Sequence, residues 1–316
     1  MSGKGKKKKQ NRQINFGFSI IICTFSPQFA KTIMTYEQFW QPLTSIYDTG
    51  EARAVARWLL EVVFSINMTD IVCGAVGQLP PNDAAKLLDM QQRLLKGEPV
   101  QYVAGVADFG PHQLHVAPGV LIPRPETYEL CQWITADVLH DRQSLHILDI
   151  GTGSGCIACT LAAAIFQAHV SAWDLSEKAL GIAQQNAQRM GVEVTFEQVD
   201  ILSKAYDPSS THSGSFDVIV SNPPYICRKE ALTMEKNVLE HEPDMALFVP
   251  DDDALLFYRA IADFATKALC EQGCLYFELN PIYATDTQTM LAEKGFTHCE
   301  IREDQFGKQR MLKAWR

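Results

Sequence analysis

The spacing of apolar residues changes along the chain near residue 125. Between residues 35 and 97 apolar residues recur three or four positions apart, as on the buried face of an amphipathic helix. In the segment 51–64 this spacing places five residues on one face: Val55, Ala56, Leu59, Leu60 and Val63. We therefore predict a small all-helical domain over residues 34–97.

Helix boundaries and turns complete the prediction for this part of the chain. Thr35, and Asn82 after two prolines, favour helix starts, whereas Gly97 favours a helix end. The segment 98–124 is rich in Gly and Pro, so we predict a linker there, with a short hairpin over 107–116.

Beyond residue 125 apolar stretches of strand length alternate with helical patterns. We expect strands at 145–150, 169–174, 194–200, 216–221 and 274–279, helices at 125–140, 176–190, 253–269 and 283–294, a further helix after a Gly-rich turn that follows residue 150, and two strands at the end. This alternation favours right-handed crossovers and a mostly parallel α/β sheet, which binds ligands at the carboxyl ends of its strands. Residues 125–316 are thus expected to form the ligand-binding domain.

Composition and charge limit the classes of function. Of the 316 residues, 47% are apolar and 21% are charged, as in a soluble globular protein of about two domains. The net charge of −9 is uneven, because the first 33 residues hold seven Lys or Arg and no acid, which leaves the rest strongly acidic. An acidic body argues against a protein that binds nucleic-acid phosphates.

Residues 1–33 have the shape of a short signal peptide, because a lysine run precedes the apolar segment 16–25. No small-x-small cleavage site follows that segment, and it is too short to span a bilayer. We expect a disordered or non-native extension of a cytoplasmic protein, with Met34 as an alternative start. The nine cysteines include a single Cys-x-x-Cys pair, which favours reduced thiols over a metal site or disulfides.

The candidate chemistry begins in the turn after the first expected strand, with Gly151, Thr152, Gly153, Ser154 and Gly155. Glycines in this turn let the backbone bend tightly and approach a ligand closely. The third glycine comes one residue earlier than in the dinucleotide-binding fingerprint, which favours S-adenosylmethionine over NAD. A purely structural turn is the alternative interpretation.

Acidic side chains end the next two expected strands. Asp174 could accept hydrogen bonds from both ribose hydroxyls, and Asp200 with Ile201 could meet the edge and the face of an adenine ring. Taken alone, each acid could equally be a solvated carboxylate or a helix cap. Three strand ends in series with suitable chemistry favour a nucleoside site.

The segment Asn222-Pro223-Pro224-Tyr225 follows the fourth expected strand and so lies on the same rim. Its prolines restrict the backbone, so the Asn222 side-chain oxygen and the Pro223 carbonyl can act as two fixed acceptors. Two acceptors match an NH2 group and can orient its lone pair toward a methyl donor. Tyr225 would supply an aromatic wall for the planar group. A structural turn is again the alternative.

Together these segments resemble the HemK/PrmC type of protein-(glutamine-N5) methyltransferases. Asn-Pro-Pro-Tyr alone is shared with adenine-N6 and guanine-N2 methyltransferases of nucleic acids. The more specific marks are Pro99–Tyr102, Leu121–Thr127, Glu242-Pro243 with Ala246-Leu247, and Asp304–Arg310. The resemblance covers the chain from about Met34 onward. It implies a Rossmann-like S-adenosylmethionine-dependent methyltransferase fold, with a mostly parallel seven-stranded sheet preceded by a small all-helical domain.

The resemblance also implies an activity and its partners. The enzyme would transfer a methyl group from S-adenosylmethionine, leaving S-adenosylhomocysteine, to the side-chain amide nitrogen of the glutamine in the Gly-Gly-Gln loop of peptide-chain release factors. No metal would take part. Release factors would be the protein substrate, recognised with the help of residues 34–97, and neither nucleic acid nor membrane would be bound.

Roles for individual residues follow from the same resemblance. The residues implied to bind the cofactor are Gly151, Thr152, Gly153, Ser154, Gly155, Asp174, Asp200, Ile201 and Asn222. Those implied to hold the substrate are Asn222, Pro223, Pro224 and Tyr225, of which Asn222, Pro223 and Tyr225 would be catalytic. Residues 124–127 would line the approach to the methionine part of the cofactor, or serve as a structural linker.

Two segments depart from the family pattern. Phe248–Asp253 stands where the family tends to have a Gly-rich stretch, and Glu278–Pro281 stands where a strand usually ends Glu-Ile-Gly. We expect neither segment to touch the glycine-rich turn or the Asn-Pro-Pro-Tyr turn.

Two other functions stay open. A nucleic-acid methyltransferase acts on a similar NH2 group but should carry a basic recognition domain, whereas residues 35–97 hold seven acids and five bases. A binding protein that lost turnover would keep the fold, but the intact Asn222, glycines and Asp174 argue against it.

Overall fold

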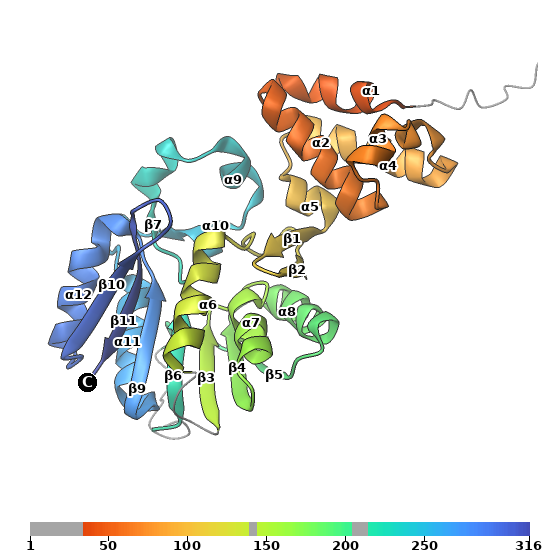
Figure 1. Ribbon diagram of the computed structural model, residues 1–316. Helices are drawn as coiled ribbons and strands as arrows, with labels where there is room; N and C mark the ends of the chain where they lie inside the picture. Colours follow the sequence, from red (N-terminus) through yellow and green to blue (C-terminus); the bar gives the residue numbers. More distant parts are fainter. Residues whose placement is uncertain (1–33, 139–143, 204–213) are drawn as a thin grey trace, which may run out of the picture.

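The structure is a computed structural model that describes residues 34–138, 144–203 and 214–316. A helical domain and a larger α/β domain are joined through a small hairpin (Figure 1). The predicted extension over residues 1–33 lies outside the described residues. So does the end of the predicted helix 125–140 beyond Val138.

The helical domain packs its amphipathic faces around one core. Its elements are α1 (Tyr36–Trp40), η1 (Gln41–Ser45), α2 (Thr49–Phe64), α3 (Met68–Val72), η2 (Ala75–Gln78), α4 (Pro81–Leu95) and α5 (Val100–Ala104). The predicted face of α2 is confirmed, because Ala56, Leu59 and Leu60 are fully buried and Val55 and Val63 pack against the same core.

Most of the helix boundaries predicted for this domain agree with the structure. Thr35 caps α1, because its side chain accepts a hydrogen bond from the Gln38 amide at 3.2 Å. Gly97, with a φ of +81°, follows the last residues of α4. The helix start predicted at Asn82 is wrong: α4 begins at Pro81, whose fixed φ suits the first helical turn and whose missing amide hydrogen is not needed there.

The predicted hairpin connects the two domains. Strands β1 (Val106–Phe109) and β2 (His112–His115) pair antiparallel, within a residue of the expected bounds. The indole nitrogen of Trp58, on α2, donates to Asp108 Oδ2 at 2.8 Å. The helical domain is therefore held against the hairpin by a side-chain hydrogen bond as well as by the chain itself.

The α/β domain contains a seven-stranded sheet with the order β10-β11-β9-β6-β3-β4-β5. The strands are β3 (Leu145–Ile150), β4 (Ala168–Asp174), β5 (Val194–Gln198), β6 (Phe216–Ser221), β9 (Leu269–Glu278), β10 (His298–Glu303) and β11 (Gln309–Trp315). The first five of these are parallel, and β10 and β11 form an antiparallel hairpin at one edge. The predicted mostly parallel α/β sheet is confirmed.

Helices cover both faces of the sheet (Figure 1). They are α6 (Pro125–Val138), α7 (Cys156–Ala164), α8 (Glu177–Met190), α11 (Leu256–Ala268) and α12 (Ala284–Glu293). Alternate residues of a strand point to opposite faces, so on β3 Ile147 joins the core under α6 and α7, whereas Leu148 joins the core under α11 and α12. Both faces are buried, which explains why the central strands are continuous apolar runs.

Some predicted boundaries differ from the structure. β5 ends at Gln198 rather than residue 200, because the chain then turns and the Ser203 amide bonds the Asp200 carbonyl at 3.0 Å. β9 begins at Leu269 rather than residue 274, with an irregular register opposite β6. α11 begins at Leu256 rather than residue 253, because the preceding residues form turns.

A lobe between β6 and α11 was not predicted. It contains β7 (Ile226–Cys227), η4 (Arg228–Thr233), α9 (Lys236–His241), α10 (Asp244–Leu247) and β8 (Phe248–Val249). β7 and β8 pair in parallel and close the lobe at its base. Figure 1 shows it above the carboxyl ends of the strands, on the side that carries the helical domain.

Candidate active site

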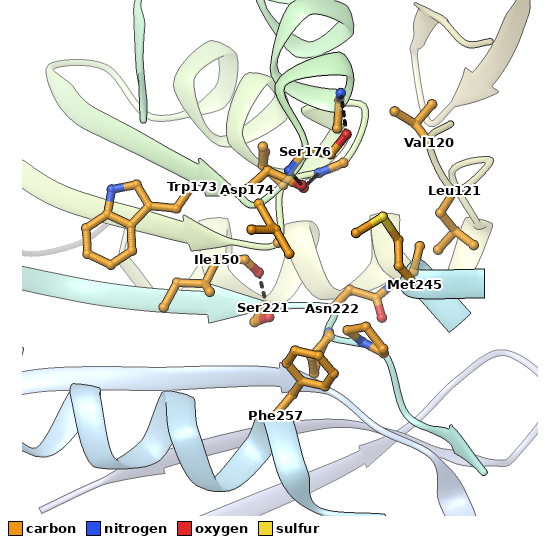
Figure 2. Close-up of a pocket in the computed structure, with 18 of the residues that line it drawn as sticks. Val120, Leu121, Ile150, Trp173, Asp174, Ser176, Ser221, Asn222, Met245 and Phe257 are labelled. Carbon is orange, nitrogen blue, oxygen red and sulfur yellow. Dashed lines mark hydrogen bonds between the residues drawn. The ribbon is translucent and has the colours of Figure 1, made fainter. Parts of the chain in front are cut away.

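A cavity of about 390 Å³ opens at the carboxyl ends of the central strands. That volume lies within the range of small-molecule sites. Its wall comes from the turns after β3, β4, β5 and β6, from the segment before α6, and from the lobe and α11. Figure 2 shows Ile150, Asp174, Ser221 and Asn222 around it. The predicted placement of a ligand at these strand ends agrees with the observed cavity.

The glycine-rich turn adopts a backbone that side chains rarely allow. Gly151, Gly153 and Gly155 have φ values of +74°, +56° and +79°. A Cβ on Gly151 or Gly153 would meet nothing within 4 Å, whereas one on Gly155 would lie 2.9 Å from the Ala183 Cβ. The first two glycines thus leave open space, and the third allows α7 to pack closely on α8.

Asp149 holds this turn in place through hydrogen bonds. Its carboxylate is fully buried, and Oδ2 accepts hydrogen bonds from Thr152 Oγ1 at 2.6 Å and from the Ala158 amide at 3.2 Å. Burial raises the pKa of Asp149 to about 7, although both hydrogen bonds lower it. Oδ1 has no hydrogen-bond partner among the described residues.

The two predicted nucleoside-binding acids both line the cavity. Asp174 ends β4, where Oδ2 accepts from the Gly153 amide and Oδ1 from the Ser176 amide, each at 2.8 Å. Burial raises the pKa of Asp174, and these amides oppose the shift. Asp200 and Ile201 lie in the turn after β5 and line the same wall.

The predicted substrate segment lies directly after β6. Asn222, Pro223 and Pro224 line the cavity, together with Thr127 at the start of α6. The Asn222 amide nitrogen donates to Thr127 Oγ1 at 3.2 Å. No hydrogen bond within the described residues occupies the Asn222 side-chain oxygen.

Tyr225 has a different environment from its neighbours. It is not among the residues that line the cavity, and its hydroxyl donates to Glu278 Oε1 at 3.0 Å. The Asn280 side-chain nitrogen also donates to the Tyr225 carbonyl at 3.1 Å. Our expectation that residues 278–281 would not touch the Asn-Pro-Pro-Tyr turn is therefore wrong. Strand β9 is adjacent to β6 in the sheet, which brings the two segments together.

The lobe and the segment before α6 meet at an ion pair. Arg124 lines the cavity, and its guanidinium lies 2.5 Å from Glu242 Oε1. Glu242 Oε2 accepts a hydrogen bond from the Ile122 amide at 3.0 Å. This buried carboxylate therefore fixes one cationic side chain at the cavity wall.

The chain is similar to curated relatives along most of its length. It is 41% identical over 274 residues to the release factor glutamine methyltransferase of Bacteroides thetaiotaomicron, which is 87% of this chain and 96% of the relative. It is also 41% identical to the protein of that name from Flavobacterium psychrophilum, over 88% of this chain and 96% of the relative. This chain belongs to the release factor glutamine methyltransferase family.

Family domains and a solved structure agree with this membership. Residues 41–105 match the PrmC N-terminal domain, and residues 133–244 match the methyltransferase small domain. The catalytic domain of hMettl16, solved in complex with MAT2A 3'UTR hairpin 6, aligns with a TM-score of 0.51 at 16% identity, over 74% of this chain and 81% of that one. That likeness concerns the fold alone. The Rossmann-like methyltransferase fold behind a small helical domain is confirmed.

Several residues of the site were not predicted from the sequence. Met245 and Phe248 of the lobe line the cavity, and Glu242 and Glu278 hold residues of its wall. Glu242-Pro243 was noted as a motif, but nothing in the sequence shows that its carboxylate is buried. The strand-end position of Glu278 was the available signal.

Metal-binding clusters and membrane-spanning helices are both absent from the described residues. No three His, Cys, Asp or Glu side chains in residues 34–138, 144–203 and 214–316 are grouped so as to hold a metal ion. Within those same ranges, no helix is both long enough and apolar enough to cross a membrane.

Proposed function

We propose that this protein transfers a methyl group from S-adenosylmethionine to the side-chain amide nitrogen of the glutamine in the Gly-Gly-Gln loop of peptide-chain release factors. Family membership supports the class of substrate. The observation that carries the proposal at the site is the Asn222 side chain, whose NH2 group is bonded to Thr127 and whose oxygen is left to accept.

Asn222 and Pro223 suit an incoming primary amide. The glutamine NH2 group has two hydrogens, and the Asn222 oxygen and the Pro223 carbonyl are two acceptors on neighbouring residues of the cavity wall. An amide nitrogen is a poor nucleophile, because its lone pair is delocalised into the carbonyl. Two acceptors orient that lone pair and stabilise the positive charge that develops on nitrogen as the new bond forms. The N-methylated cation is strongly acidic and loses one N–H proton to water, so a side-chain base is not required.

The cavity fits S-adenosylmethionine in shape and chemistry. Gly151 and Gly153 leave open space where side chains would stand, and Asp174 offers carboxylate oxygens suited to ribose hydroxyls. Ile201 and Phe257 give apolar surface for an adenine ring. Arg124 would hold the carboxylate of the methionine part. When bound, the cofactor supplies an electrophilic methyl group on a positively charged sulfur.

The helical domain would contribute to recognition of the release factor. Like the lobe, it lies beyond the carboxyl ends of the strands (Figure 1). A hydrogen bond from Trp58 to Asp108 joins it to the hairpin. A release factor that inserts its loop into the cavity would therefore meet the lobe and the helical domain together.

A methyl-transfer assay tests the proposal. The purified protein is incubated with methyl-labelled S-adenosylmethionine and, in separate reactions, with a release factor, with the same factor after its Gly-Gly-Gln glutamine is changed to alanine, or with tRNA, rRNA or DNA. Asn222→Ala is the enzyme control. We expect label on the intact factor only, and loss of that label with Asn222→Ala. Label on tRNA, rRNA or DNA, with none on the factor, would contradict the proposed substrate.

A further inference from the structure

One buried carboxylate is linked to both ends of the Asn-Pro-Pro-Tyr segment, to Tyr225 directly and to Asn222 through the Thr127 hydroxyl. Glu278, the last residue of β9, has a relative exposure of 2%. Its Oε2 accepts a hydrogen bond from Thr127 Oγ1 at 2.5 Å, and its Oε1 accepts one from the Tyr225 hydroxyl at 3.0 Å. Thr127 Oγ1 in turn accepts from the Asn222 amide nitrogen at 3.2 Å.

We propose that Glu278 is a positioning residue that determines, through the Thr127 hydroxyl, which end of the Asn222 amide faces the substrate. This inference rests on the proposed function, because it concerns the acceptor that the glutamine NH2 group would meet.

Donor and acceptor rules give the chain of hydrogen bonds a single direction. An ionised carboxylate can only accept, so the one hydroxyl hydrogen of Thr127 is directed to Glu278. The Thr127 oxygen is then left as an acceptor, and only the NH2 end of the Asn222 amide can satisfy it. The two ends of an amide have nearly the same shape, so hydrogen bonding rather than packing selects between them.

If the hydrogen bonds among Asn222, Thr127 and Glu278 lost this fixed direction, substrate binding would weaken. Without a buried acceptor beyond it, the Thr127 hydroxyl could donate to the Asn222 oxygen, and the amide could turn over. The Asn222 NH2 group would then face the glutamine NH2 group, donor against donor. Tyr225 is held by the other oxygen of the same carboxylate, so Glu278 fixes the first and the last residue of the segment relative to each other.

Thr127→Val tests the proposal, because valine keeps the shape and removes the hydroxyl. Thr127→Ser restores the hydroxyl and should restore most of the function. Thr135→Val is the matched control: it lies on the same helix, and its hydroxyl donates to the Cys131 carbonyl of that helix at 2.8 Å. Thr127→Ala removes the same hydroxyl and serves if valine impairs folding.

Binding is measured by titrating a Gly-Gly-Gln peptide into each variant saturated with S-adenosylhomocysteine, beside the affinity for S-adenosylhomocysteine itself. We expect Thr127→Val to weaken peptide binding roughly tenfold or more, and by a larger factor than it weakens binding of S-adenosylhomocysteine, and Thr135→Val to match the wild type. The inference is overturned if Thr127→Val binds the peptide normally, if Thr127→Ser fails equally, or if cofactor and peptide affinity fall by the same factor. Failure of the wild type to bind the peptide would instead count against the proposed function.

Discussion

The Arg124 guanidinium lies 2.5 Å from the buried Glu242 carboxylate, and this contact joins the wall of the cavity to the lobe above it. The two residues are 118 positions apart in the chain. Their contact means that the lobe does more than cover the site, because it holds a cationic side chain at the wall.

Glu242→Gln should weaken cofactor binding several-fold and lower the free energy of unfolding by about 1–3 kcal/mol. Glutamine offers one acceptor, whereas the Arg124 guanidinium and the Ile122 amide each need one. Titration with S-adenosylhomocysteine and urea unfolding measure the two effects. Asp244→Asn is the control, because its pair with Arg228 is 3.6 Å long and both side chains are 64% exposed. Equal effects of the two substitutions would contradict the role of Glu242.

Gly155→Ala should destabilise the protein by about 2–5 kcal/mol and abolish cofactor binding. The new Cβ would lie 2.9 Å from the Ala183 Cβ, in a backbone with a φ of +79°, so α7 and α8 would have to separate. Gly191→Ala is the matched control, because its φ is +68° but nothing lies within 4 Å of an added Cβ. It should cost only about 1 kcal/mol. Thermal unfolding with and without S-adenosylhomocysteine compares them, and similar losses would show that packing between α7 and α8 is not the cause.

The pH dependence of stability should report the buried Asp149. Burial raises its pKa to about 7 in the folded protein, from the usual value of 3.8. A raised folded pKa contributes stability that is fully present below the unfolded pKa and is lost as pH rises through the folded one. The wild type should therefore lose stability relative to Asp149→Asn between about pH 4 and pH 7. Denaturant unfolding of both proteins across this range is the test, and a constant difference between them would contradict it.

The pH dependence of activity should report Glu278. Burial raises its pKa, against the hydrogen bonds from Thr127 and Tyr225 and the nearby Arg310 charge, while Glu126 raises it further. As pH falls through this raised pKa, the protonated carboxyl can donate to Thr127 and reverse the chain of hydrogen bonds. As the pH is lowered, we expect kcat/KM for the release factor to begin to fall at a higher pH than it would if activity depended on an exposed glutamate. Glu278→Gln cannot titrate and should lack this limb, so an unchanged profile in that variant would contradict the account.

The sheet, and the gathering of the candidate site residues at one rim of it, could be predicted because they depend on local patterns. Continuous apolar runs marked the parallel strands, and the carboxyl ends of such strands share one edge, which placed Gly151, Asp174 and Asn222 together. The lobe could not be predicted, because β7 and β8 have two residues each and form only through tertiary packing.

The buried glutamates that hold residues of the site could not be predicted for a different reason. Glu242 and Glu278 are charged side chains whose burial depends on partners far away in the sequence. Charged residues are seldom buried, so a glutamate in a sequence is expected at the surface unless its partner is known. Strand-end placement located Tyr225 on the correct rim, but it could not show that the hydroxyl turns to Glu278.

In the proposed reaction the methyl group is accepted by an amide nitrogen that Asn222 holds. Acid hydrolysis of release factor methylated with labelled S-adenosylmethionine tests this, because hydrolysis of an N-methylated side-chain amide releases methylamine. The account predicts labelled methylamine from the wild-type reaction and none with Asn222→Ala or with the glutamine changed. Label that stays on an amino acid after hydrolysis, or methylamine that persists with Asn222→Ala, would contradict it.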